Sequence, residues 1–119
     1  MDNSRKFVYI VDLKPECFET YKMRHKDVPV ESQLFEVGFK KVDISFWNST
    51  DPEVPVRLIM TGLWAATKEG ESFESAMERY QSLPGVKEWE EDMDKLKLPL
   101  PGCSGTRWQE CSSIYNLES

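Results

Sequence analysis

Three stretches of the chain carry the hydrophobic patterns of β-strands. Residues 7–11 form an unbroken run of aromatic and β-branched residues, which is typical of a buried strand. Residues 39–47 alternate apolar and polar side chains, and this predicts a strand with one wet face. Residues 56–65 predict a third strand, joined to the second as an antiparallel hairpin. A last strand is expected at residues 106–117, where the alternation is less regular.

Between these strands, apolar residues recur at helical spacing. Residues 15–36 are expected to be helical from Pro15, a residue suited to the first turn of a helix. This helix should bend or break near Val28-Pro29, because a residue before proline avoids helical geometry. Two further helices are expected on either side of Pro84-Gly85, the first starting near Ser72.

The resulting order is strand, helix, strand, strand, helix, strand. It predicts a ferredoxin-like βαββαβ fold of the α+β class, with a four-stranded antiparallel sheet and helices on one face. We expect residues 1–119 to form a single domain, because a chain of this length buries a core without disulfides or a structural metal. The other sheet face is expected to be apolar and to pack against a second copy. Residues 98–105, a proline-rich linker, are placed to carry the last strand onto that partner.

Composition narrows the range of functions. The chain has 21 acidic and 15 basic residues, a net charge of -6, and no basic patch, so we expect no binding to nucleic acid or to an anionic membrane. No stretch approaches the roughly 20 apolar residues that span a bilayer, and no signal-peptide core follows the start of the chain. Three cysteines without metal-site spacing favour a cytoplasmic protein with reduced thiols. The acidic residues among 88–92 are expected on a solvated helix face.

His25, the chain's single histidine, lies on the apolar stripe of the first helix. A titratable ring on a buried stripe needs a partner, a water or a ligand. Without further context, such a histidine is more often a core residue than a catalytic one, and Tyr21 and Trp89 are more often core packing. Glu19, Lys22 and Lys26 are expected on the opposite side. The apolar stripe covers roughly 100° of the helix and consists of Cys17, Phe18, Tyr21, His25 and Val28.

The residues around His25 give a family resemblance. Residues 15–25 read Pro-x5-Tyr-x2-Arg-His, which is similar to the motif of the L-rhamnose mutarotase family. Residues 87–93 read Lys-Glu-Trp-x3-Met and resemble that family's tryptophan-bearing helix. Residues 108–110, Trp-Gln-Glu, are similar to its closing strand. The resemblance spans nearly the whole chain, and its specific elements are Tyr-x2-Arg-His and Trp-x3-Met.

This resemblance implies a homodimeric α/β barrel with no metal and no organic cofactor. It also implies interconversion of the α and β anomers of a monosaccharide, a 6-deoxy hexose such as L-rhamnose or L-fucose. His25 would be the general acid/base residue, and a side chain with an unperturbed pKa of about 6.5 suits that task. Tyr21 and Trp89 would bind the sugar. Asp43 is a further candidate if it points inward, although strand parity groups it with Lys41 and Ser45.

The chain departs from that family's pattern at three places. The Ile-Trp-Pro-Glu run often found after the histidine reads Val-Pro-Val-Glu at residues 28–31. Adjacent tryptophans are replaced by Trp89-Glu90, and a sugar-contacting tyrosine is replaced near Val42 or Asp43. Anomer exchange is therefore better supported than L-rhamnose as the substrate. The alternative is a non-catalytic dimeric α/β barrel that binds a small ligand or a partner protein. A cofactor-free monooxygenase or isomerase on the same barrel has less support.

Overall fold

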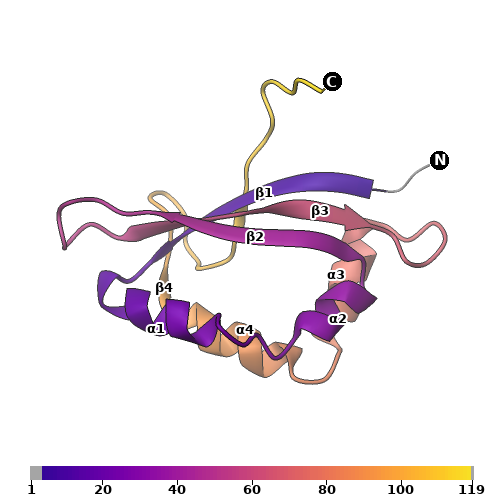
Figure 1. The fold of residues 1–119 in the computed structure, drawn as a ribbon, viewed down its shortest axis with the longest axis horizontal. Coiled ribbons are helices and arrows are strands. Elements are labelled where there is room, and N and C mark those ends of the chain that lie inside the picture. Colours follow the sequence, from indigo (N-terminus) through magenta and orange to yellow (C-terminus); the bar gives the residue numbers. More distant parts are fainter. Residues whose placement is uncertain (1–3, 119) are drawn as a thin grey trace.

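In the computed structural model, which describes residues 4–118, helices cover one face of an antiparallel sheet (Figure 1). The C-terminal segment projects from the other face. No helix in the described part of the chain is long and apolar enough to cross a bilayer. The elements in chain order are β1 (Ser4–Leu13), the short 3-10 helix η1 (Pro15–Cys17), α1 (Phe18–Arg24), α2 (Glu31–Glu36), β2 (Phe39–Trp47), β3 (Val56–Ala65), α3 (Phe73–Gln81), α4 (Val86–Asp94), β4 (Lys97–Leu98) and β5 (Gln109–Glu110).

The sheet has the strand order β2-β3-β1-β4, and β5 also pairs with β1. β1 and β3 pair along their whole length, from Ser4 opposite Ala65 to Leu13 opposite Val56. Because β3 occupies one edge of β1 completely, β4 and β5 both pair with its other edge. β4 pairs with Asp12 and Leu13, and β5 pairs with Tyr9 and Ile10. The expected antiparallel, ferredoxin-like α+β architecture is confirmed.

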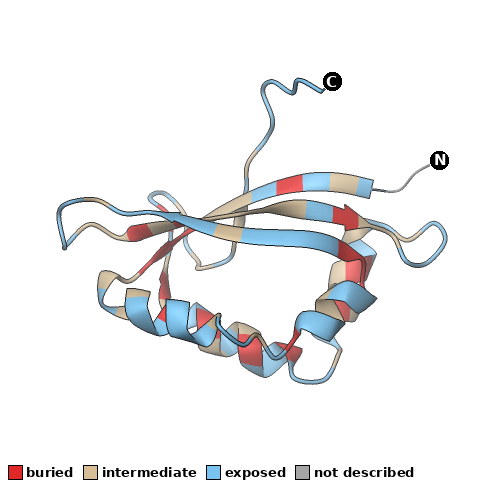
Figure 2. Ribbon diagram, in the orientation of Figure 1, coloured by how far each residue is buried: buried red, intermediate tan, exposed pale blue. Residues whose placement is uncertain are grey.

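The core lies between the sheet and the helices. Side chains alternate along a strand, so one set of residues on β1 and β3 faces the helices. The helices bury apolar side chains of their own, and Figure 2 marks these buried residues in red on α1, α3 and α4. The indole N–H of Trp64, which is buried, donates to the Val37 carbonyl at 2.8 Å. The core includes Phe7, Val11, Leu13, Leu58 and Trp64 from the sheet and Tyr21, Val37, Tyr80, Trp89 and Met93 from elsewhere.

The first helical region breaks earlier than expected. α1 ends at Arg24, and His25 is its C-cap residue with φ -89° and ψ 4°. Turns fill residues 25–30 before α2 begins. Pro29 explains the position of the break, because a proline ring in a continuing helix would collide with the carbonyl four residues earlier, that of His25. The histidine therefore lies at the end of a helix rather than within one.

The expected last strand at residues 106–117 is wrong in extent. Only Gln109–Glu110 pair with β1, and the backbone N–H of Cys111 makes a further hydrogen bond to the Val8 carbonyl. The free edge of β1 is shared with β4, which lies at the start of the expected linker. Pro99 and Pro101 lack the backbone N–H that pairing with a neighbouring strand requires. The place of the expected fourth strand is therefore taken by two short strands, β4 and β5.

Gly38 closes the helical region for two physical reasons. Its φ of +115° lies where only glycine is unstrained. A Cβ at this position would also collide with the carbonyl oxygen of Ala65 and lie 2.7 Å from the Trp64 indole nitrogen. The Ala65 N–H donates to the Gly38 carbonyl at 2.9 Å, so the close approach joins the start of β2 to the end of β3.

We expect Gly38→Ala to lower the free energy of unfolding by about 3 kcal/mol or more, because backbone strain and collision act together. Gly70→Ala is the matched control, since Gly70 has φ +72° but no atom near its Cβ position. The control should lose only about 1–2 kcal/mol. Urea denaturation measures both values, and equal losses would contradict the role of the close approach.

Candidate functional site

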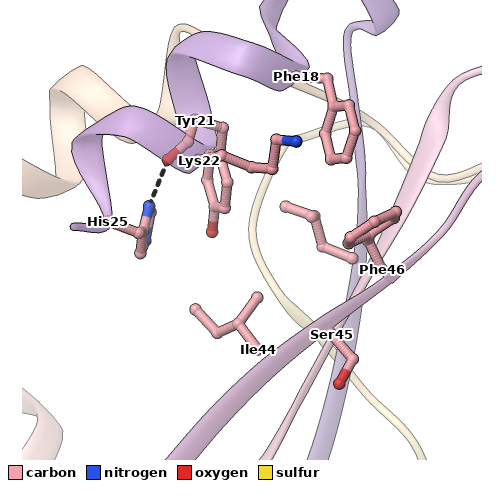
Figure 3. Close-up of a pocket in the computed structure, with 8 residues that line it drawn as sticks. Phe18, Tyr21, Lys22, His25, Ile44, Ser45 and Phe46 are labelled. Atoms are coloured by element: carbon pink, nitrogen blue, oxygen red, sulfur yellow. Dashed lines mark hydrogen bonds between the residues drawn. The ribbon is translucent and has the colours of Figure 1, made fainter.

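A cavity of about 240 Å³ lies between α1 and the edge strand β2 (Figure 3). α1 and its C-cap residue form one wall, and the sheet forms the other. The cavity residues that come from the sheet are mostly apolar, whereas the helical wall carries titratable groups. The lining residues are Phe18, Tyr21, Lys22 and His25 on the helical side and Ile44, Ser45, Phe46 and Leu58 on the sheet side.

His25 and Tyr21 form the polar part of this cavity. Their rings stack with centroids 4.1 Å apart and an angle of 30° between the planes. The Nδ1 atom of His25 lies 2.8 Å from the carbonyl oxygen of Tyr21 (Figure 3). A carbonyl only accepts hydrogen bonds, so Nδ1 carries the proton of the neutral ring and donates it. The other ring nitrogen, Nε2, therefore keeps its lone pair.

Burial controls the protonation of both residues. It lowers the pKa of His25 below the usual 6.5, and the positive charges of Lys97 and Arg24 act in the same direction, against the hydrogen bond to Tyr21. Burial, assisted by the negative charge of Glu90, raises the pKa of the Tyr21 phenol far above its ordinary value. At neutral pH the cavity thus presents an unprotonated imidazole nitrogen beside a protonated phenol.

Trp89 lies against the same histidine from α4. Its ring meets the His25 ring edge-on with centroids 5.2 Å apart, and the tryptophan is buried. The guanidinium of Arg24 lies 5.7 Å from the centroid of the Trp89 ring and donates to Asp92 at 3.1 Å. The structure therefore brings His25, Tyr21 and Trp89 together, with Arg24 in an ion pair at their edge.

Asp43 is not brought to this group. It pairs with Thr61 on β3, whereas its neighbours Val42 and Ile44 pair with Gly62 and Met60, which lie on the strand face turned toward the helices. Because alternate side chains of a strand point to opposite faces, Asp43 faces away from the helices while Ile44 lines the cavity.

Two features of the cavity were not expected from the sequence. Lys22 was placed on the side opposite the apolar stripe, yet it lines the cavity, and its Nζ lies 4.6 Å from the centroid of the Phe18 ring. Phe18 in turn contacts Phe46 of β2, with ring centroids 4.7 Å apart. The alternation along β2 predicted that Ile44 and Phe46 share a face, but nothing in the sequence indicated that α1 packs on this edge of the sheet.

The expectation that all acidic residues of α4 are solvated is wrong for Glu90. Glu88 and Glu91 are exposed, but Glu90 is partly buried. It lies four residues after Val86 and three before Met93, both buried, and this spacing puts it on the inner helix face. The Tyr80 hydroxyl donates to Glu90 Oε1 at 3.1 Å, and burial raises the pKa of the Glu90 carboxyl.

Metal ligands do not gather within residues 4–118, where no group of three or more histidine, cysteine, aspartate and glutamate side chains could hold an ion. Cys17, Cys103 and Cys111 are unpaired and partly buried. His25 and Tyr21 can offer proton transfer and hydrogen bonding.

Comparison with protein families supports the resemblance seen in the sequence. The family model for L-rhamnose mutarotase matches residues 6–117 of the 119-residue chain. The matched segment contains the whole cavity together with Trp89. No curated protein matches the chain.

We expect His25 to titrate below pH 6.5 in the folded protein, because burial disfavours the imidazolium. As the pH falls, the unfolded chain takes up this proton first. The histidine should therefore make the free energy of unfolding rise as the pH increases from its folded pKa to about 6.5. Above pH 6.5 it should not change the free energy of unfolding further. NMR of the single imidazole measures the pKa, and its nitrogen shifts report the Nδ1–H tautomer. A pKa at or above 6.5, or an Nε2–H tautomer, would contradict this account.

Proposed function

Since the chain belongs to the L-rhamnose mutarotase family, whose members interconvert the anomers of rhamnose, we propose that it exchanges the α and β anomers of a 6-deoxy hexose with His25 as general acid/base. One observation carries this proposal. The Nδ1–H of His25 is held by the Tyr21 carbonyl, which leaves the lone pair on Nε2 of a ring that lines a cavity.

Mutarotation opens a pyranose ring and closes it on the other face of C1. In the opening step, Nε2 of neutral His25 takes the proton of the anomeric hydroxyl, the bond between C1 and the ring oxygen breaks, and a donor protonates that oxygen. In the closing step, the freed hydroxyl attacks either face of the aldehyde and gives its proton back to the donor that supplied it, while the imidazolium returns its proton to the carbonyl oxygen. The Tyr21 carbonyl keeps the ring oriented throughout and stabilises the imidazolium.

The neighbouring residues supply the sugar contacts in this proposal. The Tyr21 phenol stays protonated at neutral pH, so it can donate to a sugar oxygen. Phe18 and Phe46 offer aromatic surface to the methyl group of a deoxy sugar. Trp89 supports the histidine ring from the side of α4. Asp43 faces the other side of the sheet, and we assign it no contact with a sugar in this cavity.

We also propose that two copies of the chain form a homodimer. Val8 and Leu63, on the sheet face away from the helices, are 38% and 36% exposed. The segment after Cys111 leaves the sheet on this same side (Figure 1) and exposes Ile114, Tyr115 and Leu117 almost fully. Apolar surface of this kind is costly in water, and a second copy would cover both features.

A cytoplasmic location is a further proposal, supported by the cysteines. All three are unpaired, which suits a reducing compartment.

We expect His25→Asn to slow anomer exchange by roughly 10²–10⁴-fold, the usual contribution of a positioned acid or base. Asparagine can still donate to the Tyr21 carbonyl, but it cannot take up a proton near neutral pH. Lys26→Gln, an exposed neighbour, is the matched control and should exchange at the wild-type rate. NMR magnetisation transfer between the α and β signals of L-rhamnose and L-fucose gives the rates.

Saturation-transfer NMR on the same samples separates catalysis from binding alone. A non-catalytic binder would contact the sugars without accelerating their exchange, and His25→Asn exchanging as fast as the wild type would remove the acid/base assignment.

We expect the wild-type chain to sediment at twice its 13.9 kDa mass and Val8→Glu to sediment as a monomer, because the new carboxylate would be buried in the interface. Thr50→Glu adds the same charge in the exposed loop between β2 and β3 and should leave the dimer intact. A monomeric wild type at micromolar concentration, or a dimeric Val8→Glu variant, would overturn this proposal.

A further inference from the structure

Tyr21 has a buried side chain whose hydroxyl group is left without a protein partner. The residue is 4% exposed, yet within residues 4–118 no group makes a hydrogen bond with its hydroxyl oxygen. In the same part of the chain, no side-chain oxygen that is sealed from solvent lacks a hydrogen bond. The Tyr21 hydroxyl is therefore not sealed, and it opens onto the cavity that Tyr21 lines. Figure 3 shows the phenol pointing from α1 across this cavity toward Ile44.

The other tyrosines that pack in or against the core use their hydroxyl groups within the protein. Tyr80 Oη donates to Glu90 Oε1 at 3.1 Å, and Tyr9 Oη accepts from the Arg5 guanidinium at 3.5 Å. A hydroxyl that gives up its hydrogen bonds with water and gains none from the protein costs free energy. Tyr21 thus offers its hydroxyl to whatever molecule occupies the cavity.

This hydroxyl accompanies the imidazole of His25. The two rings stack with centroids 4.1 Å apart, and the Tyr21 carbonyl holds the histidine in the tautomer that leaves Nε2 unprotonated. A donor and an acceptor are therefore within reach of one small molecule. In a pyranose, the anomeric hydroxyl and the ring oxygen are both bonded to C1. A base for the first and an acid for the second must accordingly be neighbours as well.

The other proton donors among the lining residues are Lys22 and Ser45, and neither lies beside His25. Lys22 Nζ is 4.6 Å from the centroid of the Phe18 ring, and Figure 3 shows it directed toward that ring. The Ser45 hydroxyl points away from Tyr21 in the same view. Among the lining residues, Tyr21 is therefore the donor that stands next to the base.

We propose that Tyr21 is a second catalytic residue, which protonates the ring oxygen as the sugar opens and takes the proton back as it closes. The inference rests on the proposed function, because it names the proton donor of the same reaction. In opening, the electron pair of the bond between C1 and the ring oxygen passes to that oxygen, which takes the phenol proton. In closing, the phenolate removes this proton from the freed hydroxyl while its oxygen attacks C1.

Opposite charges arise on the two stacked residues during this step. His25 becomes an imidazolium while Tyr21 becomes a phenolate, so the net charge of the cavity stays the same. Their attraction at a ring separation of 4.1 Å is strengthened by the low dielectric of a buried site. It offsets part of the cost of ionising a phenol whose pKa burial holds far above its ordinary value. The same burial keeps the phenol protonated until the sugar reacts.

Tyr21→Phe tests the assignment because it removes the hydroxyl and keeps the ring that stacks on His25. Since no described residue bonds to that hydroxyl, the variant should unfold at the wild-type urea concentration. We expect kcat for anomer exchange to fall by about 10²-fold or more with KM within about 3-fold of wild type, because the proton is transferred in the transition state. Tyr9→Phe, which removes a tyrosine hydroxyl outside the cavity, is the matched control and should leave both constants unchanged.

A 5-thio sugar assigns the proton to the ring atom. The substrate is the 5-thio analogue of L-rhamnose or L-fucose, whichever exchanges faster. Its ring sulfur leaves as a thiolate and needs little help from an acid, because a thiol has a pKa of about 8.5. Tyr21→Phe should therefore slow this analogue by less than about 3-fold, whereas His25→Asn should slow it as much as the parent sugar. On the parent sugar, the double variant should be about as slow as His25→Asn alone, since the two residues act as a unit.

Two results would overturn this role of Tyr21. A raised KM with the wild-type kcat in Tyr21→Phe would make the residue a binding contact only. An equal loss on the parent sugar and on its 5-thio analogue would show that the proton does not go to the ring atom. If the wild type exchanges a sugar and His25→Asn does not, these results reject the role of Tyr21 alone. If the wild type exchanges no sugar, the proposed function fails and the role of Tyr21 fails with it.

Discussion

The antiparallel ladder between β1 and β3 is the constraint on which the rest of the structure depends. Its register turns Phe7, Val11 and Leu13 toward the helices and leaves Val8 on the opposite face. A slip of one residue would exchange the two faces of β1 and drive Asp12, now paired with Arg57 at 2.9 Å, into the apolar core. The helices therefore have one apolar surface to cover, and α1 packs beside β2 at its edge.

The end of α1 decides the chemistry that this packing creates. Pro29 forces the helix to stop, and His25 becomes the C-cap residue. The last carbonyl groups of a helix lack the full set of helical partners. The Tyr21 carbonyl accepts from the backbone N–H of His25 at 3.2 Å and from its Nδ1 at 2.8 Å. One carbonyl in the last turn of the helix therefore also orients the imidazole, so the same backbone feature serves fold and proposed function.

Local patterns in the sequence were sufficient for a large part of this account. β2 and β3 have the expected bounds, because alternation and apolar runs reflect the pleat of a strand directly. Tyr21 and His25 lie together because residues four apart are neighbours on a helix whatever the rest of the chain does. The Ser72 hydroxyl accepts from the Ser75 N–H and begins α3, a capping contact that is equally local. These features follow from interactions within a few residues.

Contacts between segments that are distant along the chain could not be predicted from such local patterns. A run of acidic residues does not reveal which member turns inward, and the position of Glu90 depends on how α4 is rotated against Tyr80 of α3. The burial of Lys97 depends on Trp108, and the two-residue strands that replace the expected last strand depend on the free edge of β1. The sequence by itself determined the order of elements and the neighbouring pair Tyr21 and His25. Only the tertiary structure decided which charges are desolvated around that pair, because desolvation comes from side chains that are remote along the chain.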